Sequence, residues 1–418
     1  MLNEENNEIS QEQSHRGKGQ KLLFRIASVI LIFAIGFLAG NFIEIMPGEG
    51  MDISLLNKLK NRIDQNYYKE YDFNKVQDMT LAGMVAGLND PYSYYLPEIA
   101  QEDFDESVTG SYVGIGVTIS PDEKDYSIKV VSPMDGSPAA KAGIQAGDKI
   151  VKINGEDYTY ERIEDALKLM RGKAGEKVSL EIAREGMDDF TVEVEKAKIE
   201  TPSVEAKIID DNIAYVRISR FDMTTYDDML KALNEIEITG TNGMIMDLRN
   251  NGGGVVDIAA DIADSFLEEG NIVTLKCKNQ PDKSYDAKKG VLNVKTPIVV
   301  LVNSSSASAS EILSAALQEN GKAVLVGEKT YGKGVVNQKF KLTDKTSVVL
   351  TVGEYFTPTG KNIHGVGIEP DVPVEMSKEL KAKITTLPVN EDVQLLEAIN
   401  QVKKSEVEPH ADRQFLSD

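Results

Sequence analysis

The chain has 418 residues, which is enough for two or three domains with sizeable hydrophobic cores. Its 67 acidic residues outnumber its 46 basic residues and give a net charge of -21, so the chain lacks the basic surface that nucleic acid binding requires. A single cysteine, Cys277, excludes an internal disulfide, and three histidines make a Ser-His-Asp triad or a histidine-based metal site a poor interpretation. We therefore predict no nucleic acid partner, no metal and no cofactor.

The amino-terminal region combines a polar segment with a long apolar one. Residues 1–21 lack hydrophobic periodicity, which predicts a disordered tail. Residues 22–43 are apolar, and as a helix these roughly 22 residues would span about 33 Å, enough for a bilayer core. Because Lys21 and Arg25 lie on the amino side, we predict a single-pass anchor in the cell membrane, a cytoplasmic tail and an exported remainder. A cleaved signal peptide and a buried core helix are the alternatives, but no clear Ala-x-Ala cleavage site is present.

Residues 51–106 are predicted to be helical. Apolar residues recur there at helical spacing, as at Leu55, Leu59 and Ile63, until Asn-Asp-Pro at residues 89–91 breaks the pattern. The segment is also rich in tyrosine, with Tyr67, Tyr68, Tyr71, Tyr92, Tyr94 and Tyr95. We expect these rings to pack against a neighbouring domain rather than to stack on a ligand.

Residues 110–198 change to short strands, glycine turns and one helix. A glycine-interrupted strand at residues 111–119 precedes Ala-Gly-Ile, Ala-Gly-Asp and Ile-Asn-Gly, in that order. This segment resembles a PDZ domain, and the resemblance implies that it binds an extended carboxyl-terminal tail by strand addition. By the same resemblance, the edge that binds the terminal carboxylate consists of Gly114, Ile115, Gly116 and Val117.

Residues 199–376 alternate strands and helices, which predicts a mixed α/β domain. One buried strand ends in three consecutive glycines, Gly252 to Gly254, whose N–H groups can approach a ligand closely. A second strand, Ile298 to Val302, leads to Ser308 and Glu311, which have the spacing of a capping box at a helix start. A serine at this junction is either a nucleophile near unpaired N–H groups or only a helix cap.

A third strand leads to Gly-x-x-x-x-Gly-Lys at residues 327–333, a pattern that suggests phosphate binding. Gly334 stands where a Mg²⁺-binding Ser or Thr is required, and residues 335–342 alternate like a strand rather than a helix. We therefore exclude a nucleotide site.

Four motifs occur in one order behind the PDZ-like segment. They are Asp-Leu-Arg-Asn-Asn-Gly-Gly-Gly at 247–254, Ser-Ala-Ser-Ala-Ser-Glu at 306–311, Thr-Tyr-Gly-Lys-Gly at 330–334, and the stretch 357–371. In this order the chain resembles the carboxyl-terminal processing peptidases. The resemblance implies a serine nucleophile, which falls on Ser308, and a lysine general base, which falls on Lys333. Many members orient the lysine with a glutamine four residues later. Asn337 stands at that position here, so either Asn337 or, through a local bulge, Gln338 is the orienting amide.

The expected chemistry requires a neutral lysine. A lysine with a pKa near 10.4 is protonated at neutral pH, and lowering that pKa by about 3 units costs about 4 kcal/mol, which burial can supply. Neutral Lys333 would accept the proton of Ser308, and the N–H groups of Gly253 and Ala309 would stabilise the oxyanion.

These residues predict a multidomain α/β serine endopeptidase that acts on exported proteins with accessible carboxyl-terminal tails. We also hypothesise that tail binding switches activity, with Arg171 as the link to the α/β domain. The alternative is an inactive membrane-anchored scaffold that only binds peptides, and a homo-oligomer is possible with either. Residues 377–404 are predicted to be a closing helical segment and residues 405–418 a disordered tail.

Overall fold

The structure is a computed structural model that describes residues 52–122, 125–288, 290, 292 and 296–407. The chain divides into two compact units, Met1–Phe73 and Asn74–Asp418, which are considered separately. None of the helices in these described ranges is both long enough and apolar enough to cross a membrane. The predicted anchor at residues 22–43 and the predicted tail at 1–21 lie outside the described residues. Of the predicted tail at 405–418, residues 405–407 belong to helix α11 (Val393–Val407), and residues 408–418 lie outside the described residues.

The described part of the first unit is mainly one helix, α2 (Ile53–Asn66). Asp52 precedes it in extended conformation, and its carboxylate accepts hydrogen bonds from the N–H groups of Ser54 at 2.9 Å and Leu55 at 3.3 Å. This N-cap satisfies two of the donors that every helix start leaves unpaired, which explains why the helix begins at Ile53.

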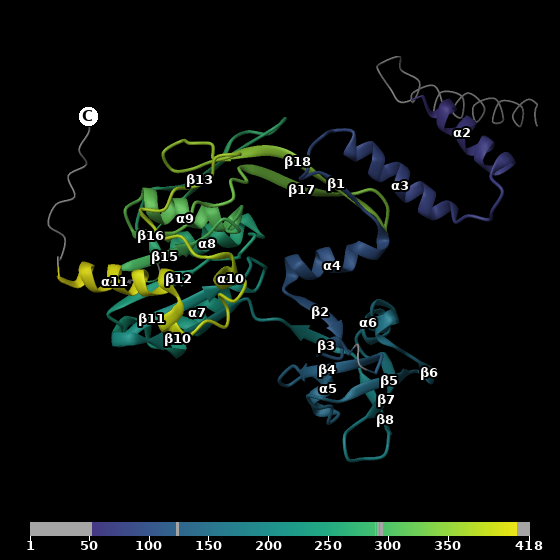
Figure 1. Cartoon of the computed structure of the whole chain (residues 1–418). Helices are drawn as coiled ribbons and strands as arrows, with labels where there is room; N and C mark the ends of the chain where they lie inside the picture. The colour runs from purple at the N-terminus through teal and green to yellow at the C-terminus, as the bar shows by residue number, and fades with distance from the viewer. Residues whose placement is uncertain (1–51, 123–124, 289, 291, 293–295, 408–418) are drawn as a thin grey trace, which may run out of the picture. The chain divides into compact units, whose positions relative to one another are not determined.

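The second unit starts with α3 (Phe73–Ala86), β1 (Tyr94–Leu96) and α4 (Glu98–Thr109) (Figure 1). These elements confirm the predicted helical character of residues 51–106, apart from the short strand that follows Asn-Asp-Pro. Gly110 has φ 70° and ends α4, because a left-handed residue stops the helix and glycine adopts that conformation without strain.

The PDZ-like segment forms a sheet with strand order β3-β4-β5-β7-β8, and β6 pairs with β5. Its strands are β3 (Val117–Asp122), β4 (Ser127–Pro133), β5 (Lys149–Ile153), β6 (Glu156–Asp157), β7 (Lys177–Ala183) and β8 (Phe190–Glu195). Two short helices, α5 (Pro138–Lys141) and α6 (Ile163–Met170), accompany the sheet, together with a 3₁₀ turn at Tyr160–Arg162. Its buried core includes Ile128, Ile150, Leu180 and Ile182.

The strand predicted at residues 111–119 is divided into two strands of different sheets. Its first part, β2 (Ser111–Gly114), pairs with β9 (Ala197–Glu200) outside the PDZ sheet, and its second part is β3. Gly116, with φ 74°, lies between them and turns the chain. As a result β3 is an edge strand of the PDZ sheet.

The α/β part of the second unit is built on a six-stranded sheet with order β10-β11-β12-β15-β16-β19. Its strands are β10 (Val204–Ile209), β11 (Ile213–Ile218), β12 (Gly243–Asp247), β15 (Ile298–Val302), β16 (Ala323–Gly327) and β19 (Val372–Pro373). All neighbouring pairs are parallel except β10 with β11. Every residue of β12 and β15 is buried, as expected for parallel strands covered on both faces.

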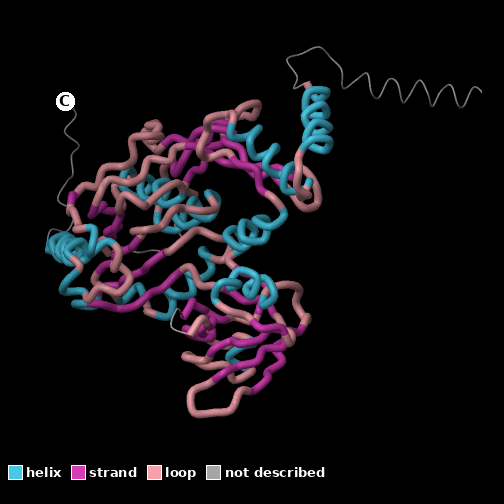
Figure 2. The backbone as a smooth tube through the Cα atoms, turned by 45° about the vertical axis from the view of Figure 1, so that its right-hand side comes forward, coloured by secondary structure: helices cyan, strands magenta, loops and turns pink. Residues whose placement is uncertain are grey.

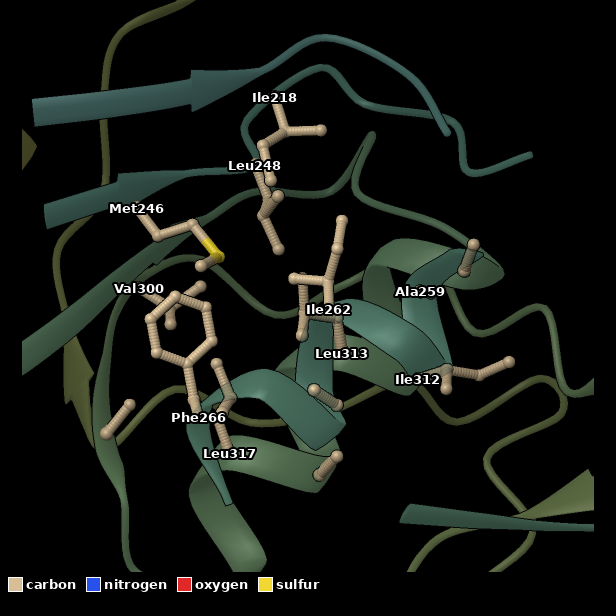
Figure 3. Close-up of a cluster of buried hydrophobic side chains, with 14 of the residues drawn as sticks. Ile218, Met246, Leu248, Ala259, Ile262, Phe266, Val300, Ile312, Leu313 and Leu317 are labelled. Carbon is tan, nitrogen blue, oxygen red and sulfur yellow. The ribbon is translucent and has the colours of Figure 1, made fainter. Parts of the chain in front are cut away.

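Helices cover both faces of this sheet. On one face, α7 (Thr225–Glu235), α8 (Val256–Phe266) and α9 (Ala309–Glu319) bury a large apolar cluster, in which Phe266 and Leu317 lie close to Met246 and Val300 of the strands (Figure 3). On the other face, α11 (Val393–Val407) packs against the sheet. The shorter α10 (Lys378–Lys381) and 3₁₀ turns at Asp210–Asn212, Ile238–Gly240 and Val389–Glu391 lie in connections.

A second, antiparallel sheet lies beside the α/β layer (Figure 2). Its strand order is β1-β18-β13-β14, and β17 also pairs with β18. The bounds are β13 (Asn271–Cys277), β14 (Lys283–Asp286), β17 (Val335–Lys341) and β18 (Ser347–Phe356). Because β1 precedes the PDZ segment while β18 follows it by about 150 residues of chain, this sheet joins both sides of the PDZ insertion.

Candidate active site

Ser308 lies between the carboxyl end of β15 and the first residue of α9. Its backbone has φ 56° and ψ -114°, a sparsely populated conformation for a residue with a side chain, which costs about 1–3 kcal/mol and is typical of functional sites. The turn is held from the loop after β12, because the Asn251 carbonyl accepts hydrogen bonds from Ala307 N at 3.0 Å and from the Ser310 hydroxyl at 2.9 Å. The surrounding structure therefore imposes the strained position of Ser308.

Glu311 is fully buried and connects the Ser308 turn with the Lys333 loop. Its Oε2 accepts from the backbone N–H of Ser308 at 2.8 Å and of Lys333 at 2.9 Å. Its Oε1 accepts from the Thr330 hydroxyl at 2.6 Å and from Gly332 N at 2.7 Å. One carboxylate thus receives four hydrogen bonds and fixes the main chains of both predicted reactive residues.

Lys333 belongs to a loop that follows β16 and is supported by the motif at residues 357–371. Thr330 N donates to Ile368 O at 3.1 Å, Ile368 N donates to the Thr330 hydroxyl at 2.7 Å, and Gly365 N donates to Gly332 O at 2.9 Å. Gly332 has φ 89°, and a Cβ there would lie 2.9 Å from Gly367 N, so the close approach of these two segments requires glycine. The 357–371 motif therefore has a structural role, because the Lys333 loop packs against it.

The Lys333 side chain is half-buried, and its Nζ lies 5.1 Å from the centre of the Tyr92 ring. Burial lowers the pKa of Lys333, whereas the charges of Asp90 and Glu311 act in the opposite direction. Across the described ranges, no hydrogen bond joins the Ser308 hydroxyl to Lys333 Nζ. The structure therefore shows the two groups on neighbouring main-chain segments with the lysine turned towards Tyr92.

Asn337 and Gln338, the two candidates for the orienting amide, differ in environment. β17 contains a register shift between Val336 and Asn337, so the local bulge considered for this strand is present. Asn337 is half-buried and its Nδ2 donates to the Tyr92 carbonyl at 2.9 Å, while its Oδ1 is buried and has no hydrogen-bond partner among the described residues. Gln338 is exposed. A buried acceptor without a partner is available to an ammonium group. Of the two candidates, Asn337 offers such an acceptor and Gln338 does not.

The two predicted oxyanion donors lie close to Ser308 but differ in availability. A Cβ on Gly253 would lie 2.7 Å from Ala307 O and 2.8 Å from the Ser308 Cβ, so only glycine allows this approach. The Gly253 N–H, however, donates to the side chain of Asn251 at 2.9 Å. Ala309 is the first residue of α9, and no acceptor for its N–H occurs in the described part of the chain.

Comparison with known proteins identifies the chain. A model described as Peptidase family S41 matches residues 212–374, and a PDZ domain model matches residues 129–184. The carboxy-terminal processing protease CtpA of Bacillus subtilis (strain 168) is 38% identical over 322 residues, which cover 77% of this chain and 68% of that protein. A carboxy-terminal-processing protease of Bartonella bacilliformis is 36% identical over 328 residues, covering 77% and 75%. The solved photosystem II D1 C-terminal processing protease is 28% identical in sequence. The structural match covers 76% of this chain and 86% of that protein's chain, with a TM-score of 0.44.

The chain belongs to peptidase family S41.

The comparisons confirm the predicted class of enzyme and the PDZ domain. The chain is a CtpA-like carboxy-terminal processing protease of the serine type. The S41 match contains Ser308, Lys333 and Asn337, whereas Tyr92 and Asp90 precede it in the sequence.

The predicted carboxylate-binding edge of the S41 peptidase leads into the free edge of its PDZ sheet. Ile115 is buried and its carbonyl accepts from Ala139 N at 2.9 Å, while Gly116 O accepts from Met134 N. Among the described residues, no hydrogen-bond acceptor is found for the N–H group of Gly116, whereas the Gly114–Arg171 bridge pairs the start of this segment with the end of α6. An unpaired N–H group beside an edge strand is what strand addition and carboxylate capture need, so this arrangement is compatible with the predicted peptide site.

Arg171 of the S41 peptidase connects the PDZ domain with α4. Its Nη1 lies 3.0 Å from Asp103 and 2.9 Å from Glu106, both on α4, and the guanidinium lies over the ring of Tyr112 at 4.8 Å. The residue is therefore paired, in contrast to the solvated arginine that is usual in a turn.

Sequence reasoning missed two residues of the S41 site. The capping-box spacing indicated Glu311 as a cap for the Ser308 turn but not its two hydrogen bonds to the Lys333 loop. Tyr92 was expected to pack against a neighbouring domain, yet its ring contacts the Lys333 ammonium and its carbonyl binds Asn337. The Asn-Asp-Pro turn before Tyr92 was the only local signal for that segment.

The first half of the Gly-rich motif is structural in this S41 chain. Arg249 is buried and pairs with Asp247 at 2.7 Å and with Asp392 at 2.8 Å, just before α11. These paired charges satisfy one another in the interior and attach α11 beneath the loops that carry the site.

Proposed function

We propose that this S41 peptidase is a membrane-anchored, exported endopeptidase that holds the carboxyl-terminal tail of a protein substrate in its PDZ domain and cleaves with Ser308 as nucleophile and Lys333 as general base. The observation that carries the proposal is the Glu311 carboxylate. It binds the main-chain N–H groups of both residues, so nucleophile and base are positioned by one buried group.

The proposed reaction starts with a neutral Lys333. Burial lowers the pKa of this lysine, which favours the unprotonated amine that a general base requires. Nζ of the neutral lysine then accepts the Ser308 proton while Oγ attacks the scissile carbonyl. Lys333 then donates that proton to the leaving amine, and water hydrolyses the acyl-enzyme by the same steps in reverse roles.

The proposed oxyanion site uses the start of α9. The Ala309 N–H has no acceptor in the described part of the chain and belongs to a helix amino terminus, where the unpaired N–H groups favour negative charge. Gly253 would be the second donor, and its N–H must then exchange the Asn251 side chain for the oxyanion. An oxygen that carries developing negative charge is a stronger acceptor than a neutral amide, which favours this exchange.

The proposed tail site lies at Gly114 to Val117 and along β3. A substrate tail would pair with β3 as an added strand, and its carboxylate would accept from the N–H group of Gly116. A chain of ion pairs connects the PDZ domain through α4 with β17, the strand that carries Asn337. Arg171 pairs with α4, and Asp105 of α4 pairs with Lys339 of β17 at 2.5 Å, two residues from Asn337. This path supports the proposal that tail binding affects the lysine side of the site.

The proposed anchor is the apolar stretch at residues 22–43, with basic residues on its amino side. The full chain is expected in the membrane fraction, with the PDZ and S41 regions on the outer face, whereas a chain starting at Met51 is expected in the soluble fraction. Protease added to intact cells or spheroplasts should digest the S41 region. Protection of that region from protease would contradict the proposed orientation.

The decisive experiment compares the full chain, purified in detergent, with its Ser308→Ala and Lys333→Ala variants. An unfolded protein with a free apolar tail is the substrate, the same protein with an amidated tail is the control, and intact mass is followed over time. We expect cleavage by the wild type, faster with the free tail, and a loss of at least about 10³-fold in both variants. If the wild type binds the tail without cleaving the substrate, the result would instead support the inactive scaffold. The presence of asparagine rather than glutamine at position 337 is the feature that favours this alternative.

A further inference from the structure

We propose that Tyr92 is a positioning residue of the S41 site, which holds the Lys333 ammonium on the face of its ring and orients the Asn337 side chain through its backbone carbonyl. The inference rests on the proposed Ser308–Lys333 mechanism. It assigns a role in the site to a segment that precedes the PDZ domain and lies outside the S41 match at residues 212–374.

The first observation is that Tyr92 contacts both members of the base side. Lys333 Nζ lies 5.1 Å from the ring centre, within the range of a cation–π interaction. The Tyr92 carbonyl accepts a hydrogen bond from Asn337 Nδ2 at 2.9 Å, and together with the Thr351 hydroxyl, which accepts from Nδ2 at 3.2 Å, it sets which way the amide points. With Nδ2 occupied, Oδ1 is the group that remains for a donor, and it is buried without a partner among the described residues.

The second observation is that Tyr92 is firmly held. Asp90 accepts from Tyr92 N at 3.0 Å and from the Ser93 hydroxyl at 2.6 Å, and Ser93 Oγ accepts from Thr351 N of β18 at 2.9 Å. The next three residues form β1, which pairs with β18. A ring fixed in this way can define the position of a flexible lysine side chain, because the ordering of the ring is already provided by the fold.

The third observation is that Tyr92 lines a cavity beside the Lys333 loop. A cavity of about 650 Å³ is lined by Tyr92, Asp90, Tyr331, Val335 and His364, among others, but not by Lys333. The His364 ring meets the Tyr92 ring edge-on at 5.8 Å. Tyr92 therefore lines this cavity and also contacts the Lys333 ammonium.

These contacts have opposite effects on the protonation of Lys333. The charged groups that face it, Asp90 from the turn and Glu311 from α9, favour the ammonium, as does the ring face of Tyr92, whereas burial favours the neutral amine. The Tyr355 hydroxyl donates to the backbone carbonyl of Lys333 and, at 3.4 Å, to that of Ser308. Tyr92 itself stays neutral, because burial raises the pKa of its hydroxyl to about 12.

The test compares Tyr92→Leu, Tyr92→Phe and the control Tyr94→Leu in the full chain, with a fluorogenic peptide that ends in a free apolar tail. Leucine keeps an apolar cover but removes the ring face. We expect Tyr92→Leu to lower plateau kcat about tenfold with KM within about twofold, and to move the acid limb of kcat/KM down by about half to one pH unit. For Tyr92→Phe and Tyr94→Leu, kcat should stay within about twofold of the wild-type value, and the acid limb of the kcat/KM profile should stay at the wild-type pH.

A shape-preserving series guards against misfolding of Tyr92→Leu. Phenylalanines with increasing fluorination at position 92 weaken the negative face of the ring, so the acid limb should move to lower pH with each fluorine. An unmoved limb across this series, or a change confined to KM, would overturn the proposal. If Lys333→Ala still cleaves, the proposed mechanism has failed instead. If Lys333→Ala is inactive and the Tyr92 series matches wild type, only the role of Tyr92 has failed.

Discussion

The nucleophile side and the base side of this S41 site are built in different ways. Ser308 follows a fully buried parallel strand and begins a buried helix, so its position results from the α/β core around it. Lys333 lies on a loop whose neighbours come from β17, from the 357–371 motif and from the turn before β1. We infer that the position of the nucleophile is fixed by the folded core. The position of the base depends on loop contacts, which can form or break without unfolding that core.

Removing the group that both sides share should have the largest effect on this comparison. In Glu311→Gln, the amide NH₂ must face two hydrogen-bond donors whichever way it turns, because each carboxylate oxygen accepts two hydrogen bonds. We expect kcat to fall about 10²-fold or more, with a lower melting temperature. Glu319→Gln, at the other end of α9, is the matched control and should keep wild-type activity. Full activity in Glu311→Gln would show that the two sides are positioned independently.

Changing the base side alone should have a smaller effect. Asn337→Ala removes the buried Oδ1 that we expect to receive the Lys333 ammonium, and kcat should fall about tenfold in steady-state assays. Asn337→Gln, which places at this position the glutamine that the family resemblance led us to expect, should retain or raise activity. Gln338→Ala is the control, since that side chain is exposed. A loss in Gln338→Ala but not in Asn337→Ala would assign the orienting role to the bulge residue.

A substitution at the contact between the PDZ domain and α4 should weakly affect the base side of the site and leave the nucleophile side unchanged. Arg171→Ala breaks the pairs with Asp103 and Glu106, which are partly exposed and therefore worth about 1 kcal/mol or less. We expect the stimulation of peptide cleavage by an added free-tail peptide to drop a few-fold, while unstimulated cleavage stays constant. Lys168→Ala on α6 is the control, because Lys168 pairs with Asp165 of the same helix. Unchanged stimulation would remove Arg171 from the proposed coupling.

The smallest expected effect concerns stability. Burial lowers the pKa of Lys333 in the folded state, so between that pKa and 10.5 the unfolded chain binds more protons, and wild-type stability rises with pH across this window. Lys333→Met has no such dependence at this position. Its denaturant midpoint should exceed that of wild type near neutral pH, and the difference should shrink as the pH approaches 10.5. A constant difference would mean that the lysine is not desolvated in the folded state.

The same contrast explains what could be predicted from sequence. The local sequence pattern predicted β15 with its observed bounds, and the Ser308–Glu311 spacing predicted the helix start that α9 shows at Ala309. The motif order pointed to Ser308 and Lys333. The hydrogen bond between Asn337 and Tyr92 joins residues 245 positions apart, and no local pattern reports such a contact. The second function of Glu311 was missed for the same reason, since the Lys333 loop is distant in sequence.

The β2–β9 pair has a consequence for how such proteases diversify. Ser111 faces Glu200 and Gly114 faces Ala197, so the chain enters and leaves the PDZ region through adjacent strands. An insertion whose ends are already side by side can be exchanged for another folded module with little strain on its host. The PDZ region is therefore an exchangeable module. A different peptide-binding domain inserted at the β2–β9 pair would be joined to the same catalytic domain and would direct it to other substrates.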